Sequence, residues 1–404
     1  MAQQIPGRGR KLLLFCLANL FGGSVYAWSL FAVPIASELT RTGIPATPAD
    51  LAFAFSLAMA GTPIGMVAGG WLNDRFGPRA SLPFAALFMF AGLFLASRAP
   101  SALLVNLAYG LVYGIGSGAN FTSSTANAIR LFPERRGLAS GLATMAFGMS
   151  SIAAPLLAGW LLTHLATAEA VTAFAGIVAS AVACCGLAAG CLPAPSQPLS
   201  QAQTPAKAFG CGPREMVKTS LFWLLFLFMA GETIAGMTLF SQMAGIARSQ
   251  IGLSAALCAL SVSALALANT CGRFIAGAAS DRFGRIETLL VMAAAGIAGL
   301  LALGLAREGN AALFFLGLAC IGLPFGGFMG IYPSLVAELF GTERVSVNYG
   351  FMAISYTLAG FAGPALLQAL GGVEAGALPY LALAALSAAG LFTGAAARRW
   401  KARR

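Results

Sequence analysis

The sequence predicts an all-α membrane protein with twelve transmembrane helices. Of its 404 residues, 58% are hydrophobic and only 9% are charged, whereas a soluble domain carries about a quarter charged residues. The apolar residues fall in blocks of about twenty, the length that a helix needs to cross about 30 Å of hydrocarbon. The blocks lack the period-two alternation of a barrel strand, and a helix satisfies its own backbone hydrogen bonds in lipid. Blocks of this kind are membrane-spanning helices.

The predicted spans can be marked one after another along the chain. They cover residues 11–33, 51–72, 80–98, 101–125, 137–161, 168–192, 220–243, 253–279, 287–306, 310–333, 346–369 and 375–397. The first block follows a short basic segment, as the apolar part of a signal peptide does. It continues through Tyr26 and Trp28 without a small-residue cleavage site, so we interpret it as a retained first helix.

The placement of Lys and Arg predicts the orientation of the spans. If the N-terminus is inside, the outer segments hold only Arg41, Arg98, Arg248 and Arg307, and the basic residues of the other connecting segments lie on the inner side. Short cytoplasmic segments collect Lys and Arg. We therefore expect a multi-pass protein of the bacterial inner membrane with both termini in the cytoplasm.

Charge and composition argue against several other classes of protein. The net charge of +11 indicates contact with anionic lipid rather than with nucleic acid. With one histidine, and with cysteines only in spans or at their inner ends, we expect free thiols and neither a metal site nor a cofactor. No span pairs Ser or Cys with His, so we expect no enzyme activity. We also expect a monomer.

A proline-rich polar stretch divides the spans into six and six. It contains Pro193, Pro195, Pro198, Pro205 and Pro213 together with Gln and Ser, a composition typical of a flexible linker. The predicted organisation is an N-terminal bundle of six helices (1–192), a cytoplasmic linker (193–219) and a C-terminal bundle of six helices (220–404).

The two halves repeat a sequence pattern. Residues 70–79 read GWLNDRFGPR and residues 277–285 read GAASDRFGR, so the aspartates are offset by 207 residues (281 − 74). Phe132 of the string FPERR is matched by Phe340 of FGTER at an offset of 208 (340 − 132). Two matches at nearly one offset indicate an internal repeat, and hence two pseudo-symmetric bundles.

With this repeat the chain resembles the major facilitator superfamily over nearly its whole length. The G-x-x-x-D-R-x-G pattern in the second-to-third and eighth-to-ninth loops is typical of that superfamily. The resemblance implies two six-helix halves related by an axis along the membrane normal, with a substrate site between them near midplane. It also implies transport of a small solute by alternating access.

The charged residues of the repeated pattern are predicted to be gating residues. Asp74 and Arg75 end one helix, and Asp281 and Arg282 end its counterpart. Charges at helix ends can bridge to neighbouring helices or to their dipoles, and such bridges must break when the two halves move. A solvated loop charge is the alternative interpretation.

A narrower resemblance lies in Tyr26 to Phe31 (YAWSLF) and in Arg130 to Gly141 (RLFPERRGLASG). Both strings are similar to the oxalate/formate antiporter branch and its monocarboxylate-transporter relatives. This resemblance implies a small organic anion as substrate, for example formate, acetate, lactate or pyruvate.

Glu232 and Arg273 are the two ionisable acid or base side chains well inside predicted spans. Intramembrane charges are costly and indicate function. Arg273 precedes Asp281 by eight residues, which places it about 12 Å along the helix from the inner end, near midplane. A guanidinium remains protonated there and offers a planar fork to a carboxylate. Arg273 is the predicted substrate ligand. The alternative is that Arg273 has a structural role, as a partner of Glu232 or of backbone carbonyls.

The resemblance supports this role for Arg273, with two departures. In the resembled family an arginine on helix eight binds the substrate, and the string from Asn269 to Arg273 (NTCGR) fits that position. The oxalate-exchanging members use a lysine on helix eleven, where this chain has Tyr356. The proton-coupled carriers often have an aspartate where this chain has Asn269. We include Asn269, Tyr26, Tyr332 and Tyr356 with Arg273 in the predicted substrate site.

Glu232 is the predicted proton-coupling residue. A carboxyl in a span of Leu, Phe and Met is desolvated, which disfavours its charged form and would let it load and release a proton. A static ion pair with Arg273, or a capping acid that faces a cavity, remains an open alternative.

The predicted function is secondary active transport of a small organic anion, with protons as the expected coupling ion. An anion antiporter of the oxalate/formate type, a drug or sugar facilitator and a membrane sensor without transport are the alternatives. In the antiporter alternative, a counter-anion would replace the proton as the species transported together with the substrate.

Overall fold

A computed structural model of the chain describes residues 7–192, 211–372 and 376–403. Within these residues it contains twelve helices that are long and apolar enough to span a membrane, and every regular element in them is helical. The predicted all-α fold with twelve spans is thereby confirmed. Residues 193–210 of the predicted linker (193–219) lie outside the described residues.

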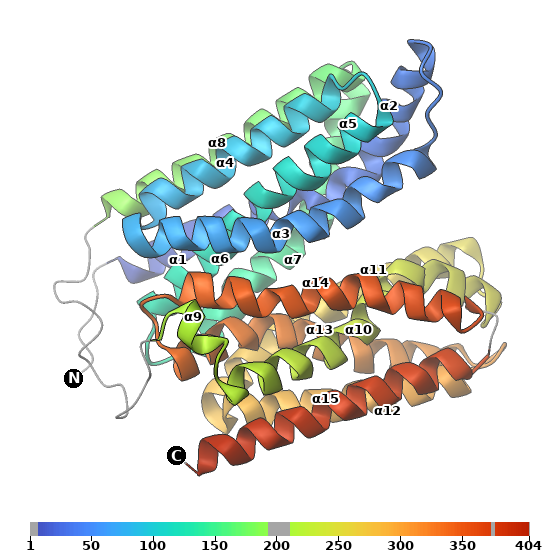
Figure 1. The fold of residues 1–404 in the computed structure, drawn as a ribbon. Coiled ribbons are helices and arrows are strands. Elements are labelled where there is room, and N and C mark those ends of the chain that lie inside the picture. Colours follow the sequence, from blue (N-terminus) through green and yellow to red (C-terminus); the bar gives the residue numbers. More distant parts are fainter. Residues whose placement is uncertain (1–6, 193–210, 373–375, 404) are drawn as a thin grey trace. The chain divides into compact units, whose positions relative to one another are not determined.

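The chain divides into two compact units (Figure 1). Unit 1 comprises residues 1–213 and 336–351, and unit 2 comprises residues 214–335 and 352–404. The segment 336–351 holds the end of one helix, a short turn and the beginning of the next helix. This segment groups with unit 1 although the chain on both sides of it groups with unit 2.

Unit 1 is built from the first six spans. Its elements are α1 (Arg8–Gly22), η1 (Ser24–Ala27), α2 (Trp28–Arg41), α3 (Pro48–Phe76), α4 (Pro78–Ser97), α5 (Ala102–Leu107), η2 (Ala108–Tyr113), α6 (Gly114–Leu131), α7 (Arg136–His164) and α8 (Thr167–Cys191). Helix α4 packs along α8, and α3 packs along α6 (Figure 1). Their buried faces form one apolar core.

Unit 2 is built from the last six spans. Its elements are α9 (Pro213–Met216), α10 (Ser220–Ser249), α11 (Ala255–Phe283), α12 (Arg285–Leu305), α13 (Ala311–Phe340), α14 (Val345–Ala369) and α15 (Leu378–Ala402). The first residue of α9, the end of α13 and the beginning of α14 belong to unit 1. Helix α15 packs against α10 and α12 (Figure 1). A second apolar core fills this unit.

The first span differs from the single helix predicted over 11–33, because it is broken at η1 between α1 and α2. A break frees backbone carbonyls that lipid cannot satisfy. Tyr109 Oη donates to the carbonyl of Val25 at 2.8 Å, and Tyr113 Oη lies 2.7 Å from Ser24 Oγ. Both tyrosines come from η2, a π-helical turn in the fourth span. Two local irregularities therefore stabilise each other inside unit 1.

The glycine that ends each repeated pattern forms the turn between two spans. Gly77 separates α3 from α4 with φ 74°, and Gly284 separates α11 from α12 with φ 93°. Side chains disfavour positive φ, so glycine is the residue that suits both turns. The turns place the aspartates of the pattern, Asp74 and Asp281, in the last turn of a long helix.

Candidate substrate and gating sites

Arg273 lies in the interior of unit 2, on the α11 span. Only 5% of the residue is exposed. Its Nε and Nη2 atoms donate hydrogen bonds to Oδ1 of Asn269, one helical turn earlier, at 3.2 and 3.1 Å. The Nε–Nη2 edge of the guanidinium is thus held by a neutral amide. The structure brings together these two residues of the predicted substrate site.

The chemistry of Asn269 determines the orientation of its amide. A guanidinium is only a donor, so the atom that faces it must be the carbonyl oxygen Oδ1 and not Nδ2. Asn269 is 4% exposed, and its Nδ2 has no hydrogen-bond partner within the described part of the chain. A buried donor without a partner is costly and calls for an explanation. Arg273 and this amide group together offer N–H donors, the chemistry that an anion needs.

Glu232 is buried elsewhere in unit 2, on α10. It is 7% exposed, and its Oε1 has no hydrogen-bond partner among the described residues. A Cβ built on Gly296 of α12 would lie 3.9 Å from Oε2, and one built on Gly390 of α15 would lie 3.4 Å from Oε1. The carboxyl therefore faces two glycines, which leave it room. Of the described residues, none forms an ion pair with Glu232.

The three predicted tyrosines have different surroundings. Tyr332 on α13 is fully buried, and its hydroxyl donates to the carbonyl of Leu225 on α10 at 2.8 Å. Tyr356 on α14 is half-buried, with its ring 6.5 Å from that of Phe325. Tyr26 belongs to η1 in unit 1 and is also half-buried. Each of the three stays a predicted substrate contact.

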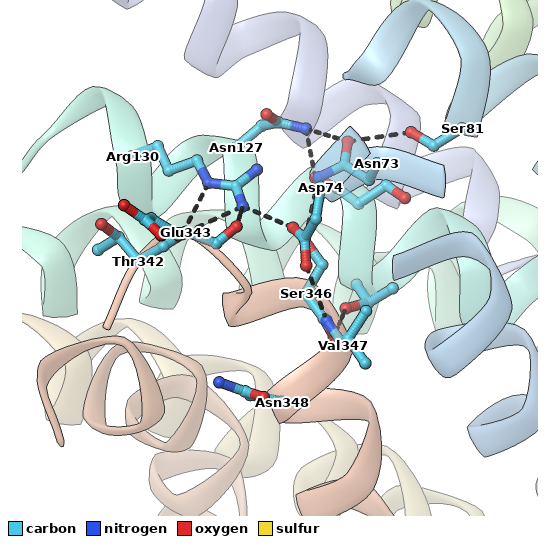
Figure 2. A network of polar contacts seen from close by, with 12 residues as sticks. Asn73, Asp74, Ser81, Asn127, Arg130, Thr342, Glu343, Ser346, Val347 and Asn348 are labelled. Atoms are coloured by element: carbon cyan, nitrogen blue, oxygen red, sulfur yellow. Dashed lines mark hydrogen bonds and ion pairs between the residues drawn. The ribbon is translucent and has the colours of Figure 1, made fainter. Parts of the chain in front are cut away.

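Asp74 is the centre of a polar network in unit 1 (Figure 2). Its Oδ1 lies 2.5 Å from Nη2 of Arg130, at the end of α6, and the two side chains are 9% and 21% exposed. The same Nη2 atom donates to the carbonyls of Thr342 and Glu343 at 3.1 and 3.0 Å. Arg130 thus joins α3 to the turn that precedes α14.

Asp74 also caps the N-terminus of α14. Its Oδ2 accepts the backbone N–H of Val347 at 3.2 Å (Figure 2). The first N–H groups of a helix have no partner within the helix, and the helix dipole favours a negative charge there. We call Asp74, Arg130 and the backbone of residues 342–347 the α14 clasp. The carboxylate of Asp74 thus pairs with Arg130 through Oδ1 and caps α14 through Oδ2.

Asp281 has a different partner in unit 2. Its Oδ1 accepts from Nη2 of Arg285 at 3.0 Å, and Nε of Arg285 donates to Ser334 Oγ at 3.1 Å. Arg75 is exposed and lies over the rings of Trp71 and Phe76, while Arg282 is exposed and lies over Phe283. The predicted gating aspartates are in polar networks, and the arginines beside them contact aromatic rings.

Sequence reasoning missed the two arginines that bind the aspartates. Arg285 follows Asp281 by four residues, a spacing at which opposite charges meet on a helix, so the sequence carried a signal for this pair. Arg130 lies 56 residues after Asp74, and neither its position at the end of a span nor its place in the RLFPERRGLASG string indicates this partner. Pairing across helices depends on packing, which the local sequence does not encode.

The twelve apolar helices of the described residues define a polytopic membrane protein. The sequence profile of the Major Facilitator Superfamily matches residues 12–364, and the chain belongs to this family. The oxalate:formate antiporter of Oxalobacter formigenes is 30% identical over 89% of this chain and 83% of its own length. YhjX of Escherichia coli, described as an uncharacterized MFS-type transporter, is 27% identical over 83% and 81%. Monocarboxylate transporter 13 of Bos taurus is 28% identical over 77% and 71%.

Solved structures of the family share the fold. The fucose:proton symporter FucP of E. coli covers 97% of this chain and 99% of its own with a TM-score of 0.71 and 14% identity. A bacterial homologue of the iron transporter ferroportin covers 96% and 100% with a TM-score of 0.73 and 16% identity. Because these identities are low, the likeness concerns the fold and not the substrate. Membership of the family makes the chain a transporter of a small solute in a lipid bilayer.

Proposed function

We propose that this protein carries a small organic anion across the bacterial inner membrane by alternating access. The substrate class is a monocarboxylate such as formate, acetate, lactate or pyruvate. The observation that carries the proposal is Arg273, a cation 5% exposed on a membrane-spanning helix. Burying such a charge costs several kcal/mol, and an anionic substrate would offset that cost. The antiporter and the monocarboxylate transporter among the relatives support the same class.

The surroundings of Arg273 suit one carboxylate. Asn269 occupies the Nε–Nη2 edge with a neutral oxygen, so it orients the guanidinium without itself neutralising it. A carboxylate matches a guanidinium in the two-bond geometry that favours Arg over Lys. The Nδ2 group of Asn269 would add a further donor. One cation matches one negative charge, so a monocarboxylate suits this site better than a dicarboxylate.

The α14 clasp supplies the gate in this proposal. Asp74 and Arg130 hold the turn that begins α14, and these bonds would break and re-form in each transport cycle. Asp281 and Arg285 would act in the second half. The excess of Lys and Arg in the segments that contain these residues supports a cytoplasmic position for both gates, with both termini on the same side.

Coupling to protons is proposed to run through Glu232. Its burial and its lack of an ion pair among the described residues suit a carboxyl that changes its protonation state. Since it faces Gly296 and Gly390, it would influence Arg273 through helix movement and not through direct pairing. Exchange of one anion for another is the second candidate, supported by the likeness to an antiporter.

Flux into proteoliposomes tests the proposal. We expect uptake of labelled formate, acetate, lactate or pyruvate above that of empty vesicles, and inhibition of that uptake by the unlabelled acid. Uptake of neutral sugars or of cationic drugs without uptake of any carboxylate would contradict the proposed substrate class. Saturable binding of a carboxylate with no flux would indicate a sensor instead.

A further inference from the structure

Asn73, the residue before Asp74, connects α3 to α4, to α6 and to the beginning of α14, which is assigned to unit 1. It is 2% exposed. Its Oδ1 accepts from Ser81 Oγ of α4 at 3.0 Å and from Asn127 Nδ2 of α6 at 2.7 Å, and its Nδ2 donates to Ser346 Oγ of α14 at 3.0 Å (Figure 2). All these partners are neutral. The α3 helix thus reaches α14 through an amide as well as through a carboxylate.

A backbone carbonyl fixes the direction of these hydrogen bonds. Asn127 Nδ2 donates to the carbonyl of Ser123 at 2.8 Å, and a carbonyl can only accept, so this atom is a nitrogen. Its other hydrogen then points to Asn73, which must present Oδ1 there. The amide of Asn73 consequently directs its Nδ2 hydrogens at Ser346. The position of the Asn73 nitrogen that donates to α14 is therefore fixed by a series of hydrogen bonds that begins at the backbone carbonyl of Ser123 on α6.

The second repeat has no counterpart to this amide. An offset of 207 residues (281 − 74) maps Asn73 onto Ser280. The hydroxyl of Ser280 donates to the carbonyl of Gly277 on its own helix, at 2.7 Å. The repeated pattern therefore carries Asp in both halves, whereas the amide that binds a second helix occurs in the first half.

We propose that Asn73 is a second residue of the gate, which holds the first turn of α14 through Ser346 by a neutral hydrogen bond. This inference rests on the proposed role of the α14 clasp in alternating access. Asp74 holds the backbone of Val347 and Asn73 holds the side chain of Ser346, so two adjacent residues of α3 bind two adjacent residues of α14. Asn73 is therefore a positioning residue for α14.

The two bonds differ in chemistry. The bond from Asp74 depends on a charge, and Arg130 supports that charge. The bond from Asn73 joins neutral groups, so it is independent of the ionisation of Asp74. Thr122 Oγ1 adds a second neutral bond to the carbonyl of Ser346 at 3.0 Å. Removing Asn73 should consequently loosen the start of α14 even when the Asp74–Arg130 pair is intact.

Amide hydrogen exchange on the purified, substrate-free full-length chain tests the proposal. We expect Asn73→Ala and Ser346→Ala each to accelerate exchange of the 345–351 amides by roughly fivefold, the loss of about one hydrogen bond. The double variant should match Asn73→Ala, because Asn73→Ala already removes the bond to Ser346 together with those from Ser81 and Asn127. Ser280→Ala is the matched control and should leave exchange in 345–351 unchanged.

Ser346→Ala keeps the proposal testable if Asn73→Ala fails to fold, since it removes only the α14 side of the bond. In transport assays it should alter the turnover rate severalfold and leave the apparent substrate affinity within about twofold, as a purely gating residue requires. Unchanged exchange in 345–351 for both variants, or additive effects in the double variant, would overturn the proposal. The exchange measurement needs no substrate. Absence of carboxylate flux in the wild type would therefore reject the proposed substrate and leave this test standing.

Discussion

Asn269 accepts two hydrogen bonds from Arg273 through a single oxygen, with Nε at 3.2 Å and Nη2 at 3.1 Å. The interaction fixes the plane of the guanidinium without neutralising it, because an amide carries no net charge. A carboxylate at the same position would cancel the charge that the proposed substrate needs. The choice of amide over acid at residue 269 is therefore central to the anion-binding account.

Asn269→Asp tests the importance of a neutral partner. The new carboxylate would pair with Arg273 and compete with the substrate, so we expect anion affinity to fall by at least about tenfold at neutral pH. Equilibrium binding at neutral pH measures the effect. Asn310→Asp, in the loop before α13, is the control, and an affinity that stays at the wild-type value in Asn269→Asp would contradict the account.

Glu232→Gln tests proton coupling. If Glu232 carries the proton, acidification outside should raise wild-type uptake, because the loaded, neutral form is then more populated. A glutamine mimics that form permanently. We expect the variant to retain exchange of labelled for unlabelled substrate and to lose accumulation driven by a pH gradient.

The matched control for this experiment is Glu169→Gln, an exposed acid in the first turn of α8. Accumulation that persists in Glu232→Gln under a pH gradient would remove Glu232 from the coupling mechanism. Loss of both exchange and folding would instead support a structural role. Exchange that is independent of external pH in the wild type would favour the antiport mechanism.

The gates are tested by Asp74→Asn and Asp281→Asn. Both should slow interconversion of the two access states more than they weaken substrate binding, because both residues lie at helix ends and not at Arg273. We expect the larger change, roughly tenfold in turnover, for Asp74, which loses a charged bond to Arg130 and weakens its bond to Val347. Turnover compared with equilibrium affinity measures the effect. Collapse of binding with normal turnover of bound substrate is the contradictory result.

Tyr332→Phe separates packing from substrate contact at one predicted position. The hydroxyl already donates to the carbonyl of Leu225, so its removal should lower the free energy of unfolding by about 1 kcal/mol. We expect substrate affinity to stay within about twofold, because the aromatic ring, which is the part of Tyr332 that a substrate would contact, is retained in phenylalanine. Thermal unfolding in detergent, together with binding, measures both quantities. A large loss of affinity at unchanged stability would make Tyr332 a direct ligand.

The fold was largely predictable because its signals are local. Span length, the scarcity of charge and the repeated G-x-x-x-D-R-x-G pattern can each be read directly from the sequence. The break in the first span was not predicted, because it depends on tyrosines from η2 that satisfy the carbonyl of Val25 and the hydroxyl of Ser24. No sequence signal within 11–33 indicates that such partners are present.

The sites were predictable to the extent that their residues are rare or closely spaced. Arg273 stands out as a charge in a span, and its partner Asn269 is four residues away. Arg130 and Asn73 were missed, because their partners are far along the chain and their roles follow from packing between helices. Arginine and asparagine near the end of a span are common, so composition alone gives them no distinct role.

Arg273→Lys is the most direct test of the central claim that a guanidinium on α11 binds the anionic substrate. Lysine keeps the charge and loses the planar fork, so we expect affinity for the transported carboxylate to fall by about 2 kcal/mol, or roughly thirtyfold. Arg248→Lys, at an exposed position near the end of α10, is the matched control and should bind and transport normally. The measurement is equilibrium binding, with flux, in variants of equal expression. Wild-type affinity and flux in Arg273→Lys would contradict the account.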